Sequence, residues 1–399
     1  MMKRIIVFVL CVLLCVPALS SCKKAPAKYT EYSFYYFDTV TTITGYAASQ
    51  AEFDRISGDV LARLGEYHKL YTIYHRFQGM ENLCTVNELL NGAHRTVTVD
   101  RRIIDLLLYA KEMYEKTDGK VNIAMGSVLS IWHDYRTEGS DEPWNAKLPP
   151  MEELAEAAKH TDIEDILIDE AASTVTLADP KMKLDVGAVA KGYAVEMVAR
   201  SLEEQGITGY VLNVGGNVRT VGAKGDGTPW TVGIDNPLED AEDPYFAYLS
   251  LAGQSLVTSG SYQRYYVVDG KPYHHIIDPD TLMPAEGYLS VSVVGGTSAD
   301  GDALSTALFC MSDVMAIGAI RALRDAGKRV PEDVSVMGLD GLDIGEYTVP
   351  KLATVCQSVD TIAQNSLELL LDQIENKTPA KHKVIPVYLE WRESARHID

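Results

Sequence analysis

The ten residues from Leu184 to Tyr193, LDVGAVAKGY, constrain the fold of this chain more than any other stretch. Three shorter signatures follow in order, at Leu212–Asn217, His274–Pro279 and Asp302–Leu308. Glycines in the first two let the backbone approach another group closely. Histidine and aspartate in the later two are side chains that handle protons and metal ions. Each signature is weak alone, and it is their order within about 125 residues that makes them informative.

The elements predicted around these signatures indicate the α+β class. Some segments carry apolar residues at helical spacing, and others are short alternating or β-branched runs separated by Gly, Asp and Pro. Runs of strands with flanking helices, without steady alternation, are typical of α+β proteins. The predicted helices are Ala51–Tyr74, Asp100–Lys116, Met151–His160 and Ala190–Gln205; the predicted strands are Tyr35–Tyr46, Asp169–Leu177, Tyr210–Val214, Trp230–Ile234, Ala247–Leu251, Ser255–Thr258, Tyr265–Val268 and Leu289–Val294.

Length and charge limit the classes of function. With 399 residues the chain can form two domains, each with its own hydrophobic core. Its 56 acidic and 36 basic side chains give a formal charge of −20, and a field of that sign repels phosphate backbones. We therefore expect no nucleic-acid partner, although a local basic patch could still bind the few charges of a dinucleotide.

Taken in order, the four signatures resemble those of the FAD:protein FMN transferases, the thiamine-biosynthesis lipoprotein or ApbE family. The resemblance covers about residues 35–310 and implies a fold of mixed sheets with flanking helices. It also implies a reaction in which FAD is bound with Mg²⁺, FMN moves to a threonine or serine hydroxyl of a partner protein, and AMP is released. The implied partners are acceptor flavoprotein subunits of membrane redox complexes.

The last signature carries the expected metal site. Asp302 and Thr306 are four residues apart, so on a helix they share one face. Carboxylate, hydroxyl and carbonyl oxygens suit Mg²⁺. The resemblance implies that these two residues bind the metal together with the backbone carbonyl of Ala188, with Ser305 as a weaker or indirect ligand. The competing interpretation of Asp302 alone is a helix N-terminal residue favoured by the helix dipole.

The resemblance also implies the residues that contact FAD. Lys191 is a natural partner for a phosphate, although a solvated helix lysine is the alternative. Gly192 would let the backbone come close to the cofactor. The full set of expected cofactor-binding residues is Phe37, Asn82, Asn122, Asp185, Lys191, Gly192, Thr258, Ser259, His275 and Ile276.

His275 and Asp278 are the expected catalytic residues. A neutral imidazole could accept the proton of the target hydroxyl, and a protonated one could stabilise the pyrophosphate. Asp278 could orient the histidine or act as the base itself. The alternative is a plain turn, Asp-Pro-Asp-Thr, with a satisfied histidine. Many relatives carry glycine after this threonine, whereas this chain has Leu282, so the loop conformation stays open.

The N-terminus predicts export. Lys3 and Arg4 precede the apolar run Ile5–Val16, which as a helix would rise about 18 Å and is too short to cross a membrane. Leu19-Ser-Ser-Cys22 resembles a lipobox. We expect a lipoprotein signal peptide at 1–21, lipidation of Cys22, a tether over 22–34 and anchoring at the extracytoplasmic face of the bacterial cell membrane. An ordinary signal peptide is the alternative.

Beyond Cys310 the sequence changes character. Residues 311–399 resemble a fragment of the sugar-sensing domain of lactose-repressor-type regulators, an α/β piece equal to half of a periplasmic-binding-protein-like domain. In that family Asp313 and Asp340 would face a sugar, but half a cleft cannot enclose one. We interpret this segment as a graft without a function of its own, either a natural fusion or an assembly chimera.

Two other functions remain open for the first 310 residues. Water could replace the protein hydroxyl, which would make the chain a Mg²⁺-dependent FAD pyrophosphatase that releases FMN and AMP. Alternatively, the chain could be a flavin-binding lipoprotein without catalysis. Cys84, Cys310 and Cys356 show no metal-ligand spacing, and we expect them to be buried apolar residues rather than a disulfide framework.

Overall fold

The computed structural model describes residues 25–237, 243–262, 264–286, 290–303, 307–310, 312–325, 327–332, 334–376, 383 and 385–395. The expected signal peptide and Cys22 lie outside these residues, as do Ser305 and Thr306. Within the described chain, none of the helices combines the length and hydropathy that a membrane span requires.

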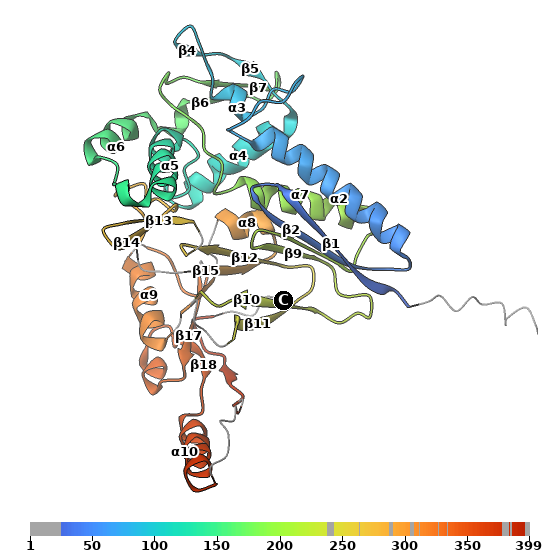
Figure 1. Ribbon diagram of the computed structural model, residues 1–399, viewed down its shortest axis with the longest axis vertical. Coiled ribbons are helices and arrows are strands. Elements are labelled where there is room, and N and C mark those ends of the chain that lie inside the picture. The colour runs from blue at the N-terminus through green and yellow to red at the C-terminus, as the bar shows by residue number, and fades with distance from the viewer. Residues whose placement is uncertain are drawn as a thin grey trace, which may run out of the picture.

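A six-stranded antiparallel sheet forms the centre of the molecule, in the order β1-β2-β8-β9-β12-β15. Helices α2 (Gln50–Tyr71) and α7 (Ala190–Glu204) cover one face of it (Figure 1). Their apolar faces meet Ile43, Leu212 and Val214 of the sheet in one buried cluster. The strands are β1 Ala27–Tyr36, β2 Thr39–Ala47, β8 Tyr210–Val214, β9 Asn217–Val221, β12 Ser255–Gly260 and β15 Ser290–Gly295.

The range Tyr35–Tyr46, predicted as one strand, contains parts of two. Tyr35–Tyr46 is a hairpin in which Phe37 and Asp38 adopt φ of 55° and 50°, the left-handed pair that a tight two-residue turn needs. Strand β1 begins at Ala27, so most of the expected tether belongs to the sheet. The tyrosines, phenylalanine and threonine of β1 favour a strand. The polar residues before them led to the prediction of a tether.

A second layer contains α3 and α4 with small sheets. Helix α4 (Arg101–Lys116) begins as expected after Asp100, whose side chain accepts from the backbone N–H of Arg102. The predicted strand Asp169–Leu177 is confirmed over Thr174–Leu177, but its first part is the end of another short strand and a turn in which Ser173 takes φ of 51°. The other elements of this layer are α3 Leu83–Val86, β3 Leu89–Leu90, β4 Ala93–His94, β5 Val97–Thr98, β6 Ile166–Asp169 and β7 Thr174–Leu177.

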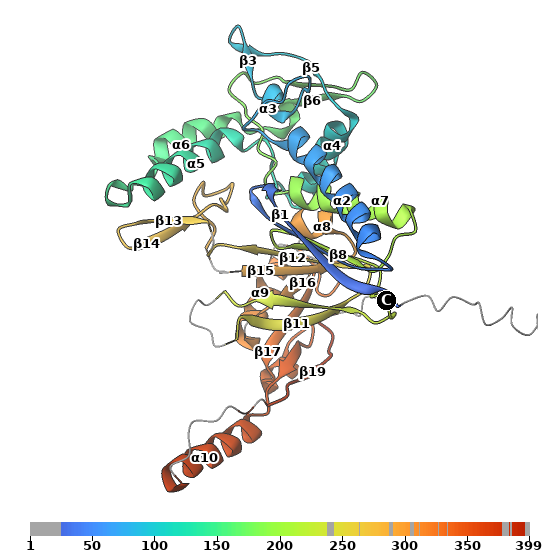
Figure 2. The ribbon, with the colours of Figure 1, turned by 45° about the vertical axis from the view of Figure 1, so that its right-hand side comes forward.

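A third group packs around the buried Trp132. It consists of α5 (Gly126–Asp141), α6 (Met151–Ala157) and the hairpin β13–β14 (Tyr265–Val268, Lys271–His274). A further hairpin, β10–β11 (Trp230–Asp235, Tyr245–Leu251), lies under the central sheet (Figure 2). Short 3₁₀ turns occur at Pro143–Asn145, Ala158–His160, Ile163–Asp165 and Asp343–Tyr347.

The C-terminal segment contributes three strands to a second, four-stranded sheet, β16-β17-β18-β19, whose first strand precedes residue 311. The first three strands are parallel and the last is antiparallel, which confirms the α/β fragment. Helix α10 extends away from the rest of the molecule (Figures 1 and 2). The strands and helices of this sheet are β16 Ala307–Phe309, α9 Asp313–Asp325, β17 Ser335–Asp340, β18 Ala353–Cys356, α10 Val359–Asn376 and β19 Tyr388–Glu390. The helix that precedes them, α8 (Ser298–Ala303), packs against α7.

Asp313 does not face a ligand in this fragment. It is fully buried, and its two carboxylate oxygens accept from Thr354 Oγ1 at 2.5 Å and from the backbone N–H of Leu342 at 2.6 Å. The residue therefore ties α9 to β18 and to the loop after β17. Of the cysteines, Cys310 and Cys356 are buried, Cys84 is half-buried, and all three are free thiols.

Candidate active site

Asp302 lies where the first two signatures meet. Its Oδ2 accepts from the backbone N–H of Gly192 at 2.8 Å, and its Oδ1 accepts from Asn217 Nδ2 at 3.1 Å. The residue is half-buried, but protein atoms surround its carboxylate, and this desolvation raises its pKa while the charge of Lys191 lowers it. A carboxylate whose two hydrogen-bond donors are both neutral is well placed to receive a cation.

Lys191 and Gly192 occupy the first turn of α7. Desolvation lowers the pKa of Lys191, the charge of Asp302 raises it, and its Nζ donates to the backbone carbonyl of Gly215 at 2.9 Å. The solvated-lysine alternative is therefore wrong. Gly192 has to be glycine, because an added Cβ would lie 2.4 Å from Asp302 Cβ and 2.6 Å from the backbone oxygen of Ser298.

The turn between β8 and β9 brings the glycine pair of the second signature to the same place. Gly215 and Gly216 both take positive φ, and a Cβ on Gly215 would lie 2.2 Å from Thr39 Oγ1. The backbone N–H of Thr258 donates to Gly216, and its Oγ1 shares a hydrogen bond of 2.8 Å with Ser292. Thr258 thus belongs to the assembly, while Ser259 beside it is exposed.

The loop before α7 holds Asp185 and Ala188. Desolvation raises the pKa of Asp185, whereas a hydrogen bond of 2.9 Å from the Gly187 N–H and the charges of His133 and Arg136 lower it. Ala188 is exposed two residues before the helix begins. Its carbonyl as a metal ligand stays a prediction, as do Ser305 and Thr306, because those two lie outside the described residues.

His275 lies beside Arg264. Its Nδ1 lies 3.2 Å from the carbonyl oxygen of Arg264, and since a carbonyl only accepts, Nδ1 carries the proton and Nε2 is the free acceptor. Burial lowers its pKa to about 4, and the charges of Arg264 and Arg136 act in the same direction. The imidazole is therefore neutral near pH 7, and of its two expected roles the structure favours accepting a proton.

Asp278 is committed to the turn that follows. It accepts from Lys120 Nζ at 3.1 Å and from the backbone N–H of Asp280 at 3.0 Å, and these bonds hold its pKa below the usual range. Neither bond reaches His275, so the turn interpretation fits Asp278 better than a base. Leu282 takes φ of 57° in the same loop, and its carbonyl accepts from Trp132 Nε1 at 2.9 Å.

Asn82 and Asn122 make hydrogen bonds within the protein, and flavin contact by these two residues, Phe37 and Ile276 stays a prediction. Asn82 is buried and caps α3, with Nδ2 bonds to the carbonyls of Lys69 and His75. Asn122 holds its own loop by bonds to the backbones of Thr161 and Ala124. Phe37 sits edge-on to the His68 ring at the hairpin tip, half-buried, and Ile276 is exposed beside His275.

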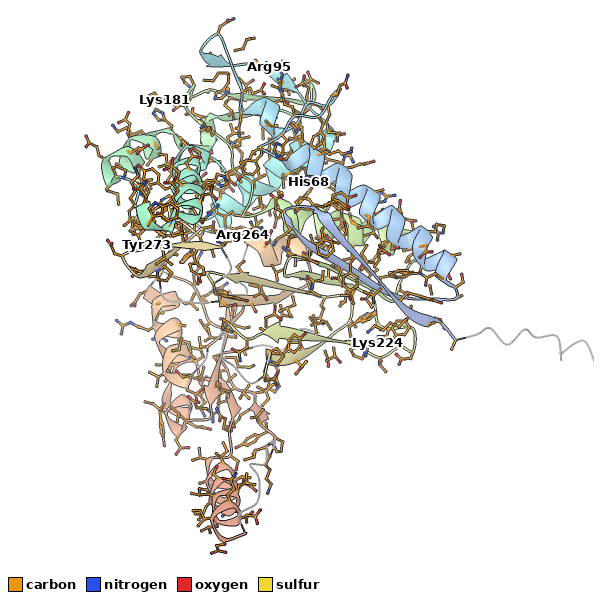
Figure 3. The ribbon with its side chains drawn as sticks, viewed as in Figure 1. His68, Arg95, Lys181, Lys224, Arg264 and Tyr273 are labelled. Carbon is orange, nitrogen blue, oxygen red and sulfur yellow. The ribbon has the colours of Figure 1, made fainter. Side chains whose placement is uncertain are left out.

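Sequence reasoning missed three residues of the site. Arg264 lies where the central sheet, α5 and β13 meet (Figure 3), and its Nη2 donates to the carbonyl of Asp38 at 3.0 Å. Arg136 on α5 is close enough that its positive charge lowers the pKa values of both Asp185 and His275. Asn217 was inside a signature but was not singled out. No spacing rule marks a single arginine, whereas the terminal asparagine of Leu212–Asn217 was a usable signal.

A model of the ApbE family matches residues 37–326, about three quarters of the chain and all four signatures. This chain belongs to the ApbE family. The FAD:protein FMN transferase of Klebsiella pneumoniae is 32% identical over 266 residues, covering 63% of this chain and 78% of the relative. The enzyme of that name from Haemophilus influenzae is 27% identical, covering 72% and 80%.

Solved structures agree with the family. The ApbE protein of Thermotoga maritima shares 28% identity and a TM-score of 0.59, covering 70% of this chain and 85% of its own. A flavin transferase ApbE from Vibrio cholerae, at 24% identity and a TM-score of 0.58, shows the same fold. A model of the periplasmic binding protein-like domain matches residues 275–395 and so overlaps the ApbE match.

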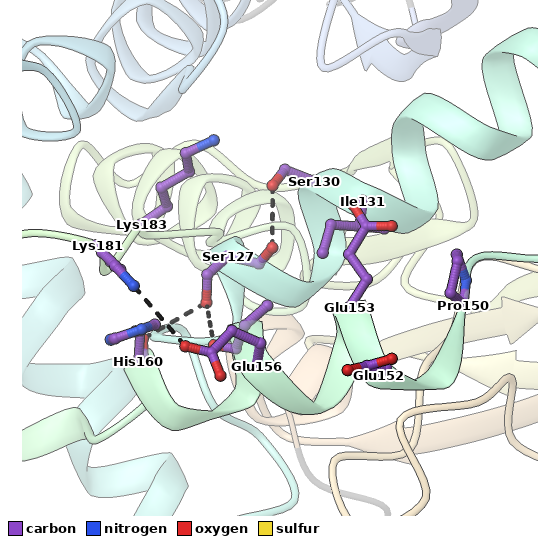
Figure 4. Close-up of a pocket in the computed structure, with 11 residues that line it drawn as sticks. Ser127, Ser130, Ile131, Pro150, Glu152, Glu153, Glu156, His160, Lys181 and Lys183 are labelled. Atoms are coloured by element: carbon purple, nitrogen blue, oxygen red, sulfur yellow. Dashed lines mark hydrogen bonds and ion pairs between the residues drawn. The ribbon is translucent and has the colours of Figure 1, made fainter.

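Two hollows on the protein surface lie away from the ApbE signatures. A groove of about 680 Å³ lies between α5 and α6, lined by Ser127, Glu153, Glu156, His160 and Lys183 among others (Figure 4). A second of about 480 Å³ runs along 76–81. Neither contains Asp302 or His275. We place the site by the convergence of its residues, since a hollow alone carries no chemistry.

The donor set at Asp302 fits a single hard cation. Within the described ranges, no three His, Cys, Asp or Glu side chains are grouped to hold a metal. Burial makes the negative charge of the Asp302 carboxylate unfavourable, and a bound cation would offset that cost. Mg²⁺ uses one or two protein carboxylates and leaves its other positions to phosphate and water.

Proposed function

We propose that this ApbE-family protein moves FMN from FAD to a threonine or serine hydroxyl of a partner protein and releases AMP, in a reaction that depends on Mg²⁺. Family membership and its relatives make the chain a flavin transferase. The observation that carries the finer proposal is the desolvated Asp302, held by Gly192 and Asn217 beside Lys191.

The proposed reaction balances without a redox step. The hydroxyl oxygen of the acceptor forms a bond to the FMN phosphorus, and the bond from that phosphorus to the bridging oxygen of the diphosphate breaks. AMP leaves with the bridging oxygen. The acceptor's proton moves to His275, whose neutral Nε2 can take it.

The basic residues would handle the phosphate charge. Lys191 is a point donor and Arg264 a planar one, and both suit phosphate oxygens. A bound Mg²⁺, on Asp302 and on the predicted ligands Thr306, Ser305 and the Ala188 carbonyl, would supply further charge neutralisation. Asp185 lies in the loop just before α7, where the charges of His133 and Arg136 lower its pKa.

Location and partners form the second part of the proposal. The basic n-region, the short apolar run and Cys22 support a lipoprotein anchored outside the cytoplasmic membrane. Acceptor subunits of membrane redox complexes would then be within reach. We further propose that residues 35–310 carry the activity and that 311–399 add none.

The test uses the chain from Cys22 onward with FAD, an acceptor flavoprotein subunit, and either Mg²⁺ or EDTA. AMP release that needs both metal and acceptor, together with an FMN mass on the acceptor, supports the transferase. AMP release that needs metal but ignores the acceptor identifies a pyrophosphatase instead. FAD that stays bound and intact identifies a flavin-binding protein without catalysis.

A further inference from the structure

A buried ion pair lies behind the candidate metal carboxylate, on the far side of Asn217. Glu196 on α7 and Arg219 on β9 are 1% and 4% exposed, and Arg219 Nε donates to Glu196 Oε2 at 3.0 Å. Arg219 also donates to the carbonyl of Thr220 at 2.6 Å and to Glu203 at 3.0 Å. An isolated buried charge would be very costly, and here each nitrogen of the guanidinium donates a hydrogen bond.

The ion pair is the start of a continuous chain of hydrogen bonds. Glu196 Oε2 accepts from the backbone N–H of Ser298 at 2.8 Å, and Ser298 Oγ donates to Asn217 Oδ1 at 3.0 Å. Asn217 then donates from Nδ2 to Asp302 at 3.1 Å. Because the Asn217 side-chain oxygen accepts from Ser298, its side-chain nitrogen must point toward the Asp302 carboxylate.

The geometry of α7 explains why this chain fixes α8. Gly192 and Glu196 are four residues apart and share one face of α7. Gly192 holds Asp302 near the end of α8, while Glu196 holds Ser298 at its beginning. A helix of six residues has no stability of its own, so these contacts set its orientation.

We propose that Glu196, with Arg219 and Ser298, is a positioning residue for Asp302 that sets the affinity of the site for a divalent cation. This inference rests on the proposed role of Asp302 in metal binding. Ligand-orienting groups behind a metal site are commonly worth ten- to a hundredfold in metal affinity, although they touch neither metal nor substrate. All of these residues precede 304 and lie within the part of the chain that the ApbE model matches.

The experiment measures Mn²⁺ binding to the chain from Cys22 onward by electron paramagnetic resonance, in the presence of FAD. Glu196→Gln should weaken binding about tenfold, because a neutral amide holds Arg219 and the Ser298 N–H less firmly. Ser298→Ala should do the same by freeing the Asn217 amide, and Ser298→Thr, which keeps the hydroxyl, should restore binding.

Arg200→Gln is the matched control. Arg200 contacts the same carboxylate at 2.9 Å from the solvent side with 52% of its side chain exposed, so its loss should change Mn²⁺ affinity less than twofold. Thermal melting of each variant separates a loss of folding from a loss of affinity. If Glu196→Gln does not fold, the Ser298 pair decides the question.

Unchanged Mn²⁺ affinity in folded Glu196→Gln or Ser298→Ala overturns the inference, and so does a wild-type chain that binds no Mn²⁺. Failure of the proposed function looks different: Mn²⁺ binds, the variants weaken it as expected, and no FMN reaches the acceptor. Equal weakening by Arg200→Gln would show a general electrostatic effect and also overturn the inference.

Discussion

Helices α7 and α10 are similar in length, at 15 and 18 residues, yet they are used in opposite ways. More than half of α7 is buried, including the charged Glu196. On α10 the apolar residues Leu367, Leu370 and Ile374 are all more than half exposed. An apolar stripe therefore predicts a helix in both cases, but it does not say whether anything covers that stripe.

The difference separates the two parts of the chain. The ApbE signatures lie on elements that fix one another through buried polar contacts. The C-terminal segment has a small core around Val336 and Leu352 and leaves much apolar surface uncovered. We expect mutations of equal chemistry to act differently in the two parts, and the following pairs test this.

The largest contrast should come from two aspartates. Asp302→Asn removes the charge that the site offers a cation and should lower metal-dependent AMP release by roughly 10³-fold, a loss of several kcal/mol of charge stabilisation. Asp313→Asn, in the other part, should leave AMP release within about twofold and lower stability instead. Initial rates and thermal melting, measured on both variants, check this; a comparable loss of rate in both would break the comparison.

Two leucines test the packing difference. Leu202 on α7 is fully buried, so Leu202→Ala should cost about 2–5 kcal/mol of unfolding free energy. Leu370 on α10 is 52% exposed, and Leu370→Ala should change it by no more than about 0.5 kcal/mol. Urea unfolding followed by circular dichroism gives both values. A large cost at Leu370 would mean that a partner covers α10 in solution.

Replacing each of two helical glycines by alanine should change the stability of the protein in opposite directions. Gly192→Ala would push a Cβ into Asp302 and Ser298, which should destabilise the protein by about 1–3 kcal/mol and weaken Mn²⁺ binding. Gly318 on α9 has open space around it, so Gly318→Ala should stabilise by about 0.5–1 kcal/mol. Melting temperatures and Mn²⁺ titrations measure both effects, and two changes of the same sign would refute the packing argument.

The sequence predicted the elements better than the contacts between them. The helices α2, α4 and α7 and strands such as Tyr210–Val214 were confirmed, because their periodicity is local. The turn at Phe37–Asp38 was missed, since two non-glycine residues adopt the left-handed conformation there. The signatures brought Lys191, Gly192 and Asp302 together correctly. Arg264, which is exposed, was missed because no spacing marks it. The Glu196–Arg219 pair was missed because a buried charge is recognisable only once its partner is placed.

The pH dependence of the reaction should sharpen the description of the ApbE part. His275 has a pKa of about 4, below its ordinary value, chiefly through burial. The unfolded chain therefore binds more protons at this residue between about pH 4 and 6.5, so its contribution to stability is complete above 6.5 and is lost as the pH falls toward 4. The rate of transfer should likewise stay level from pH 8 down to about 5.

An ordinary histidine base would instead lose about nine tenths of its rate between pH 7.5 and 5.5. Arg264→Gln removes a nearby positive charge that lowers the pKa of His275, so the acid limb of the pH profile should move to higher pH in this variant. The measurement is kcat/KM for AMP release across pH 4.5–8, with His275→Gln as the control that lacks the limb. An acid limb centred near 6.5 in the wild type would show that His275 is not the buried, neutral base that the geometry describes.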